Sequence, residues 1–248
     1  MTDFGTFASQ SNGSPDVYAA YIREDPFRIG SHFPAVTAEI GDLYNKRILD
    51  MGTGDGQLPR LLATNGAAAV GYDHNPRMIR QALAHADNRH LDVKFVEATP
   101  RGFHDDDPFD AATSVMVLNY AADRDGLADF FRCAQRHLVP GGRFVSIVLS
   151  PQFTAFDADF VVRRFVKRDA DHVHMQFLDE QSGKVIQQAV THQYAKDDFE
   201  RAARTAGMRP EGWKTLDAAP QAMTAKGDGF WQPFLEHQPY AMFIARNG

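Results

Sequence analysis

The chain is short of cysteine, of excess positive charge and of long apolar runs, and each shortage excludes a class of protein. Its 248 residues include one cysteine, Cys133, which rules out an intrachain disulfide and a multi-cysteine metal site. Its 26 lysines and arginines are outnumbered by 32 aspartates and glutamates. Because nucleic-acid binding draws much of its affinity from neutralised phosphates, DNA and RNA are disfavoured as partners. No apolar run approaches the roughly 20 residues of a membrane span, so we expect no membrane partner.

The N-terminus lacks the marks of a secretion signal. The stretch MTDFGTFASQSNGSPDVY has neither a basic start nor an apolar core, and we expect a cytoplasmic location. Residues 1–15 are rich in serine, glycine and asparagine, which predicts a flexible arm. Residues 16–46 then show two short helical patterns that are separated near Pro26.

Residues 47–150 alternate short apolar runs with helical patterns. Strand, helix and strand in succession, with short connections, predict an α/β fold with a doubly wound, mostly parallel sheet. Ligands of such sheets bind at the carboxyl ends of the strands. Asp50, Asp73, Glu97 and Asn119 fall at or just past predicted strand ends. We therefore expect these four side chains to gather along one edge of the sheet.

The pattern changes beyond residue 150. The segments HVHMQFLD and KVIQQAVTHQY flank a turn at residues 180–183 and predict a β-hairpin insert. Residues 208–215 and 240–245 predict two final strands, which complete a seven-stranded sheet. An aromatic-rich stretch lies between these two strands.

The stretch KRILDMGTGDGQLPRL, residues 46–61, places an acid at the mouth of a glycine-rich turn. A dinucleotide-binding loop follows the pattern G-x-G-x-x-G, but Gln57 stands where the third glycine belongs. Asp50 would also repel a diphosphate, whereas it would attract a cation. S-adenosylmethionine (SAM) carries a sulfonium and an ammonium group and no phosphate. Asp73 ends the next strand, where a carboxylate accepts the hydroxyls of a ribose. SAM therefore suits both acids; the alternative is that the glycines form only a tight strand-to-helix turn.

Four segments together resemble the class I SAM-dependent methyltransferases. ILDMGTGDG is similar to the first motif of that family, VGYDHNPRMI to its second, VEAT to its third, and LVPGGRFVSI to the segment that leads into its fifth strand. The resemblance implies a Rossmann-like methyltransferase sheet, SAM as cofactor and S-adenosylhomocysteine (SAH) as product. It also implies one domain over residues 16–248. In that domain we expect a helical lid at 16–46, a SAM-binding half at 47–150, and an insert and acceptor side at 151–248.

A narrower resemblance runs along almost the whole chain. YIREDPFR, VLNYA, PGGRFVSI and DGFWQPFLEHQP resemble the toxoflavin-synthase-like branch, whose members transfer methyl groups to ring nitrogens of azapteridines. This resemblance implies a flat nitrogen heterocycle of secondary metabolism as the acceptor.

The family resemblance assigns cofactor contacts residue by residue. Gly52, Thr53, Gly54 and Gly56 line the methionine and ribose, Asp73 holds the ribose, His74 and Met78 flank the adenine, Glu97, Ala98 and Thr99 reach its other edge, Leu118 and Asn119 meet the methionyl end, Arg28 meets the carboxylate, and Tyr18 and Tyr21 close over the sulfonium. Asp50 joins this set through its charge.

Most of these side chains also have a purely structural interpretation. Arg28 has acids nearby with which it could pair. Tyr18 and Tyr21 have a helical spacing that suits core packing. Met78 is of a type common in cores, and Asn119 at a strand end can satisfy backbone groups. These alternatives stay open on the sequence.

Methyl transfer from a sulfonium is an in-line displacement, which needs alignment and a dry site but neither a metal nor a covalent nucleophile. We therefore expect a lid, a stacking pocket and no metal. The aromatic candidates for acceptor binding are Tyr18, Tyr120, Trp231 and Tyr240, with core packing as the alternative. His192 is the candidate base for a ring N–H. His172 and His174 share a strand face but lack a third metal ligand.

Other acceptors and functions compete with this interpretation. VLNYA stands where amino-group methyltransferases of adenine or glutamine carry an Asn/Asp-Pro-Pro-aromatic run, which disfavours those substrates. We expect N-methylation of a small heterocyclic metabolite by a monomer or homodimer, with O- or C-methylation as the alternative. An NAD-dependent oxidoreductase and a non-catalytic SAM-binding module are more remote.

Overall fold

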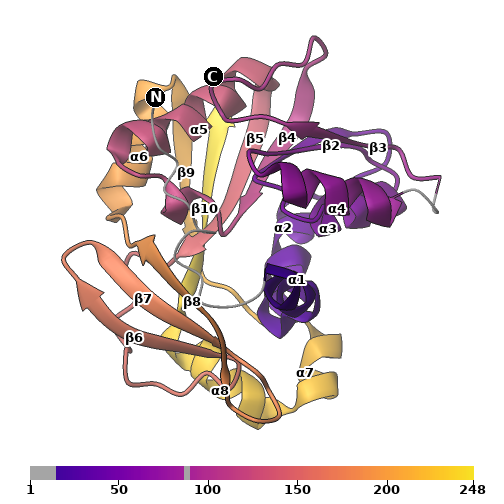
Figure 1. Ribbon diagram of the computed structural model, residues 1–248. Helices are drawn as coiled ribbons and strands as arrows, with labels where there is room; N and C mark the ends of the chain where they lie inside the picture. Colours follow the sequence, from indigo (N-terminus) through magenta and orange to yellow (C-terminus); the bar gives the residue numbers. More distant parts are fainter. Residues whose placement is uncertain (1–14, 87–89) are drawn as a thin grey trace.

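In the computed structural model, which describes residues 15–86 and 90–248, a seven-stranded sheet forms the centre of the molecule (Figure 1). Its strands lie in the order β3-β2-β1-β4-β5-β10-β9, and only β10 runs antiparallel to its two neighbours. This confirms the expected doubly wound, mostly parallel sheet. The strands are β1 (Arg47–Met51), β2 (Ala68–Asp73), β3 (Val93–Glu97), β4 (Phe109–Val115), β5 (Leu138–Leu149), β9 (Met208–Lys214) and β10 (Tyr240–Asn247).

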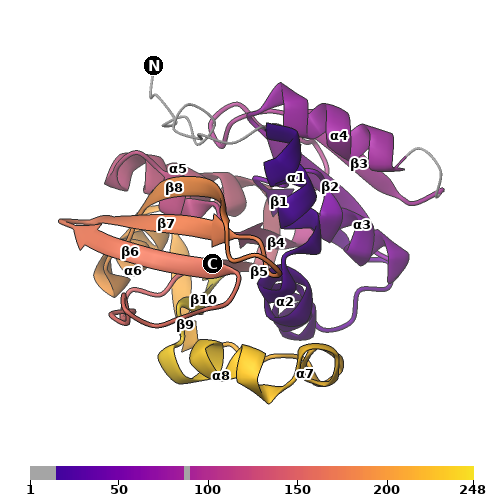
Figure 2. The ribbon, with the colours of Figure 1, turned by 60° about the horizontal axis from the view of Figure 1, so that its bottom comes forward.

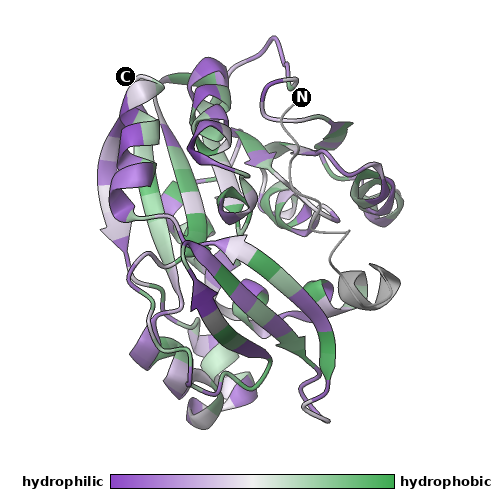
Figure 3. Ribbon diagram, turned by 60° about the vertical axis from the view of Figure 1, so that its left-hand side comes forward, coloured by the Kyte–Doolittle hydropathy of each residue, from purple (hydrophilic) through white to green (hydrophobic). Residues whose placement is uncertain are grey.

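Helices cover both faces of this sheet because its strands are apolar on both sides. Ile48 packs with one layer and its neighbour Leu49 with the other, as the two-residue period of a strand requires. Figure 3 shows hydrophobic residues along the central strands and hydrophilic residues on the outer turns of the helices. The first layer contains α2 (Phe33–Ile40), α3 (Gln57–Thr64) and α4 (Pro76–Ala86), and the second contains α5 (Arg124–His137) and α6 (Lys196–Thr205).

The insert is a three-stranded antiparallel sheet of β6 (Arg163–Asp169), β7 (His172–Leu178) and β8 (Val185–His192). The expected hairpin is β7–β8, and the structure adds β6. The sequence of β6, RRFVKRD, is too rich in charge to show the alternation of a half-buried strand. Figures 1 and 2 show that this sheet, α1 (Pro15–Glu24), α7 (Pro220–Lys226) and α8 (Asp228–His237) lie beyond the same end of the central sheet.

The N-terminal segment has the expected break near Pro26. α1 ends at Glu24, and a π-helical turn, η2 (Arg28–His32), then leads directly into α2. The arm expected at residues 1–15 lies outside the described residues apart from Pro15, which begins α1. The side chains of residues 15–19 and of Lys167 also lie outside the description. Over the described ranges, no helix combines the length and apolar character that crossing a bilayer requires.

Candidate functional site

The acid of the glycine turn lies at the carboxyl end of β1, beneath the turn itself. Asp50 is 4% exposed and accepts a hydrogen bond from Thr113 Oγ1 over 2.8 Å. Burial raises the pKa of Asp50 to about 6, although the hydrogen bond from Thr113 and the charge of Arg28 oppose that rise. A carboxylate that is costly to ionise in the free protein gains most from a cation placed beside it.

The glycine turn combines two closed positions and an open one. A Cβ on Gly52, whose φ is +72°, would meet Val117 at 2.5 Å, and a Cβ on Gly56 would meet Phe95 at 2.4 Å. Gly54 has φ +58°, and nothing lies within 4 Å of the place of its missing Cβ. Packing inside the protein therefore explains Gly52 and Gly56, whereas the bare α-carbon of Gly54 faces open space where a ligand can approach.

Asp73 is fixed as an acceptor at the carboxyl end of β2. Its Oδ2 accepts a hydrogen bond from Gly54 N and its Oδ1 from Asn75 N, each over 2.9 Å. Ala98 N donates to the Asp73 carbonyl oxygen over 3.0 Å, which joins the end of β3 to the same place. Each carboxylate oxygen keeps a further lone pair, so the group can still accept the two hydroxyls of a ribose.

The residues expected around an adenine surround Asp73. His74 is exposed with its Nδ1 3.6 Å from Asp73 Oδ1, and Met78 is half-buried on α4. Glu97 pairs in register with Asp73 and is exposed. Thr99 is half-buried, and its Oγ1 accepts a hydrogen bond from Gly102 N, which closes a turn of its own. The structure thus brings these positions together, and their contacts with a cofactor stay predictions.

Helix α1 is tied to the glycine turn by contacts that the sequence did not predict. Gln57 Nε2 donates to the Arg23 carbonyl oxygen over 2.9 Å. Arg23 Nε lies 3.6 Å from Asp55 Oδ2, and the Asp55 side chain is fully buried. His85 Nδ1 lies 3.9 Å from the same oxygen. Asp55, a second acid of the glycine turn, therefore contacts helix α1.

Leu118 and Asn119, in the short helix η3 (Leu118–Tyr120), do not have free side chains for the methionyl end. Asn119 Oδ1 accepts from Leu149 N over 2.8 Å, and Asn119 Nδ2 donates to the His192 carbonyl oxygen over 2.7 Å. Leu118 is fully buried in the core with α5. The Asn119 side chain joins the central sheet to the insert, which fits its backbone-satisfying alternative, and a contact of this position with the methionyl end stays a prediction.

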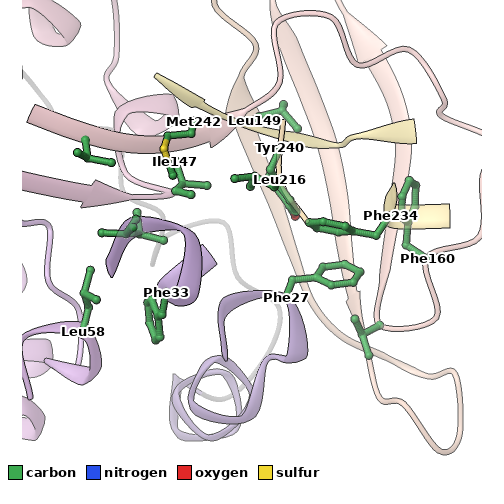
Figure 4. Packing of buried hydrophobic residues seen from close by; sticks show 14 of the residues in the cluster. Phe27, Phe33, Leu58, Ile147, Leu149, Phe160, Leu216, Phe234, Tyr240 and Met242 are labelled. Atoms are coloured by element: carbon green, nitrogen blue, oxygen red, sulfur yellow. The ribbon is translucent and has the colours of Figure 1, made fainter. Parts of the chain in front are cut away.

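Trp231 and Tyr240, which were expected to stack on an acceptor, lie in the core, and their contact with an acceptor stays a prediction. Both are fully buried, and Trp231 packs against Phe27 with ring centroids 5.7 Å apart. Figure 4 shows Phe27, Phe234 and Tyr240 packed side by side beneath the sheet. In the described structure these rings contact one another as core residues.

Three further aromatic candidates, Tyr21, Tyr120 and Tyr18, differ in their surroundings. The Tyr21 hydroxyl donates to the Val162 carbonyl oxygen over 2.9 Å and accepts from Arg163 Nη2 over 3.3 Å, so it joins α1 to β6. Tyr120 is half-buried, and burial raises its pKa above the ordinary value. The Tyr18 side chain lies outside the described residues.

Arg28 does not pair with the neighbouring acids. Its Nη1 donates to the Ile22 carbonyl oxygen over 3.3 Å, and its guanidinium lies 5.2 Å from the centroid of the Phe33 ring. Asp25 pairs with Arg163 instead, through Nη2 and Oδ2 at 2.5 Å. The positive charge of Arg28 acts on Asp50, which keeps a role for Arg28 near a cofactor carboxylate as a prediction.

His192, the candidate base, lies at the end of β8. Its ring centroid is 4.2 Å from that of His172 and 5.0 Å from that of Tyr194, at the junction of the insert with the start of α5. Burial, and then the charge of His172, lower its pKa. A role of His192 as base stays a prediction. Among the described residues, no three His, Cys, Asp or Glu side chains are grouped as a metal site.

A polar cluster that the sequence did not predict lies between the N-terminal segment and the insert. Arg163 Nη1 donates to the Tyr240 hydroxyl, and the same guanidinium pairs with Asp25. His32 is fully buried, with its ring centroid 4.8 Å from that of Tyr240. No local pattern marks these residues, because three separate segments supply them.

Comparison with known proteins agrees with this geometry. The family model described as a methyltransferase domain matches residues 48–142. The chain is 37% identical over 110 residues to a demethylmenaquinone methyltransferase of Thermus thermophilus. The aligned residues make up 43% of this chain and 48% of that protein. It is 27% identical over 197 residues to a ubiquinone biosynthesis O-methyltransferase of Chelativorans sp., 77% of this chain and 69% of that protein. The chain thus spans about half the length of the first of these relatives.

Solved structures share the fold. The SAM-bound amino pentose methyltransferase CalS10 of Micromonospora echinaspora has a TM-score of 0.65 and 17% identity, over 94% of this chain and 97% of that one. The 1,6-didemethyltoxoflavin-N1-methyltransferase of Burkholderia thailandensis, solved with its substrate and SAH, has a TM-score of 0.59 and 16% identity, over 94% and 82% of the two chains. These comparisons confirm the expected fold, which proteins described as SAM-dependent methyltransferases share. Residues 48–142 thus match a methyltransferase domain, and the fold as a whole is that of solved SAM-dependent methyltransferases.

Proposed function

We propose that this protein transfers a methyl group from SAM to a ring nitrogen of a small, flat heterocycle of the azapteridine type. The observation that carries the cofactor half is the Asp73 carboxylate, which Gly54 N and Asn75 N fix at the open side of the glycine turn. Asp50 supplies a buried carboxylate beside it. When bound, SAM supplies an electrophilic methyl group on a sulfonium.

The residues around this edge suit a cationic nucleoside. Asp73 would hold the ribose, Asp50 and Arg28 would face the charged amino-acid end, and Gly54 would leave room for close approach. The role of residues 16–46 and of the insert would be to exclude water and align the acceptor, which can contribute about 7–11 kcal/mol to catalysis.

The nitrogen acceptor is supported by the likeness in fold to the toxoflavin N1-methyltransferase. O-methylation is the second candidate, because the ubiquinone biosynthesis O-methyltransferase matches over 197 residues. Both reactions use the same cofactor site, so they differ only in the acceptor.

Mass spectrometry of the products decides between them. The protein is incubated with SAM and, in separate reactions, with 1,6-didemethyltoxoflavin, simple pteridines, and flavonoids with free hydroxyls. A one-methyl gain on a ring nitrogen, lost in Asp73→Ala and kept in the exposed-site control Asp106→Ala, would support the proposal. Methylation of hydroxyls alone would favour the second candidate. If the protein methylates none of these compounds, both candidates are contradicted.

A further inference from the structure

His32 stands out among the buried side chains because its imidazole is fully buried and neither ring nitrogen has a hydrogen-bond partner among the described residues. A buried polar atom without a partner costs about 1–3 kcal/mol, and native proteins retain few of them. Tyr240 faces the ring edge-on at an interplanar angle of 81°. An N–H directed at that ring would engage one nitrogen weakly and would leave the other unpartnered.

The backbone around His32 is unusual in the same place. His32 ends η2, the π-helical turn of Arg28–His32. Such turns are rare in proteins, and those that occur are often at functional sites. Gly30 in the middle of this turn packs so tightly that a Cβ would lie 2.7 Å from the Trp231 ring. Gly30 O also accepts a hydrogen bond from Ala219 N over 2.7 Å. The imidazole is therefore held on a rigid turn, where its orientation is fixed.

His32 lies between the cofactor side of the site and the insert. The ring it meets, Tyr240, pairs in register with Leu149 at the carboxyl end of β5, and Leu149 N donates to Asn119. On the other side, Arg28 of the same turn carries the charge that acts on Asp50. His32 thus lies near the carboxyl ends of the central strands, the edge at which ligands of such sheets bind.

Aromatic rings surround His32, and the charged groups near it include an ion pair whose two charges offset each other. Phe234 and Tyr240 lie beside it, and the nearest charges are Arg28 and the Asp25–Arg163 ion pair. Burial lowers the pKa of His32 to about 3, because it disfavours the charged imidazole more than the Asp25 carboxylate favours it. The neutral ring offers one N–H donor and one acceptor lone pair. It is therefore suited to an uncharged partner and unsuited to removing a proton.

We propose that His32 contacts the methyl acceptor, forming through a ring nitrogen the hydrogen bond that orients the N–H or carbonyl edge of an uncharged aromatic heterocycle. This inference rests on the proposed function and names a specificity-determining residue of the same site. Access to His32 requires that α1 and β6 separate, because Asp25 and Arg163 close the space between them.

The test compares His32→Phe with His137→Phe, a second buried histidine that has a partner. His137 Nδ1 donates to the Cys133 carbonyl oxygen over 2.8 Å, on the opposite face of the sheet. Phenylalanine keeps the ring in both cases. We expect His32→Phe to raise the urea midpoint, to leave SAH affinity within twofold, and to lower kcat/KM for the acceptor at least tenfold, mainly through KM. His137→Phe should lower the midpoint and leave the kinetic constants unchanged.

The acceptor in these assays is whichever member of the panel above the wild type methylates fastest. His32→Asn and His32→Gln, which return a polar atom near Nδ1 and Nε2 respectively, should recover part of the lost kcat/KM. The inference is overturned if His32→Phe keeps kcat/KM within twofold, or if it loses stability as His137→Phe does. If the wild type methylates no member of the panel, the proposed function has itself failed and the inference falls with it.

Discussion

Asp25 and Arg163, which stand 138 positions apart, form an ion pair from which solvent is almost excluded. Arg163 Nη2 donates to Asp25 Oδ2 over 2.5 Å, and each side chain is 3% exposed. Asp25 follows α1 and also accepts a hydrogen bond from Phe27 N over 3.0 Å, whereas Arg163 begins β6. One buried pair thus joins the N-terminal segment to the insert.

Removal of one partner of this pair should be strongly destabilising. Arg163→Met leaves the Asp25 carboxylate buried without its cation, and we expect a loss of about 3–5 kcal/mol in the free energy of unfolding. Urea denaturation followed by circular dichroism measures it. The double variant Arg163→Met with Asp25→Leu removes both charges and should recover most of the loss. A double variant no more stable than the single one would contradict the finding that the charges compensate each other.

Cofactor binding should strengthen as pH rises through the pKa of Asp50. Burial raises that pKa to about 6, so below pH 6 the free carboxyl is protonated and does not attract an ammonium group. We expect the affinity for SAH, measured by calorimetry, to increase about tenfold between pH 5 and pH 7. Asp50→Asn should bind more weakly and show a flat profile.

The same shift predicts the pH dependence of stability. The folded-state pKa of Asp50 exceeds the ordinary value of 3.8, so ionisation costs the folded state stability as pH rises from about 4 to about 6. Asp50→Asn should therefore unfold at a higher urea concentration than the wild type above pH 6. An equal pH slope in the two proteins would show that Asp50 is not the titrating group.

Alanine at Gly54 should separate backbone strain from ligand contact. Gly54 and Gly141 have φ of +58° and +77°, and neither has an atom within 4 Å of the place of a Cβ. Each alanine variant should cost about 1–2 kcal/mol of stability, because both force a left-handed conformation. Only Gly54→Ala should weaken SAH binding, by at least tenfold in calorimetry. Equal affinities in the two variants would remove Gly54 from the cofactor site.

The Arg23–Asp55 contact should hold the lid over the cofactor turn. In Arg23→Ala, Gln57 loses no partner because it bonds the backbone of residue 23, so α1 should loosen without detaching. We expect faster amide exchange in residues 20–24 and a several-fold faster dissociation of SAH in stopped flow. Arg204→Ala, which breaks an exposed pair with Glu200 on α6, serves as the control and should change neither. Unchanged exchange in α1 would show that the contact does not hold the lid.

The strand ends expected to hold the cofactor could be placed from the sequence because their signals are local. A strand that ends in Asp50, a glycine turn and a second strand that ends in Asp73 are each marked within a few residues. The rule that parallel strands end at one edge then brings them together. The register pair of Asp73 with Glu97 follows from the same rule.

The acceptor half could not be placed in this way. Trp231 was expected to stack on a ligand, but an aromatic residue on a helix has the same pattern whether it faces a pocket or a core. His192 was expected to act as a base, but the direction of its ring depends on how the insert docks on α5. Asn119 was expected at a strand end, but it lies in η3, past the end of β4, and its amide joins β5 to β8.

The sequence by itself determined the doubly wound sheet, its glycine turn and the positions of Asp50 and Asp73, because strand period and turn chemistry act over short distances. The tertiary structure decided the pairing of Asp25 with Arg163, the burial of His32 and the link from Arg23 to Asp55. These contacts join segments far apart in the chain, and each is fixed by the burial of groups that only the complete packing brings together.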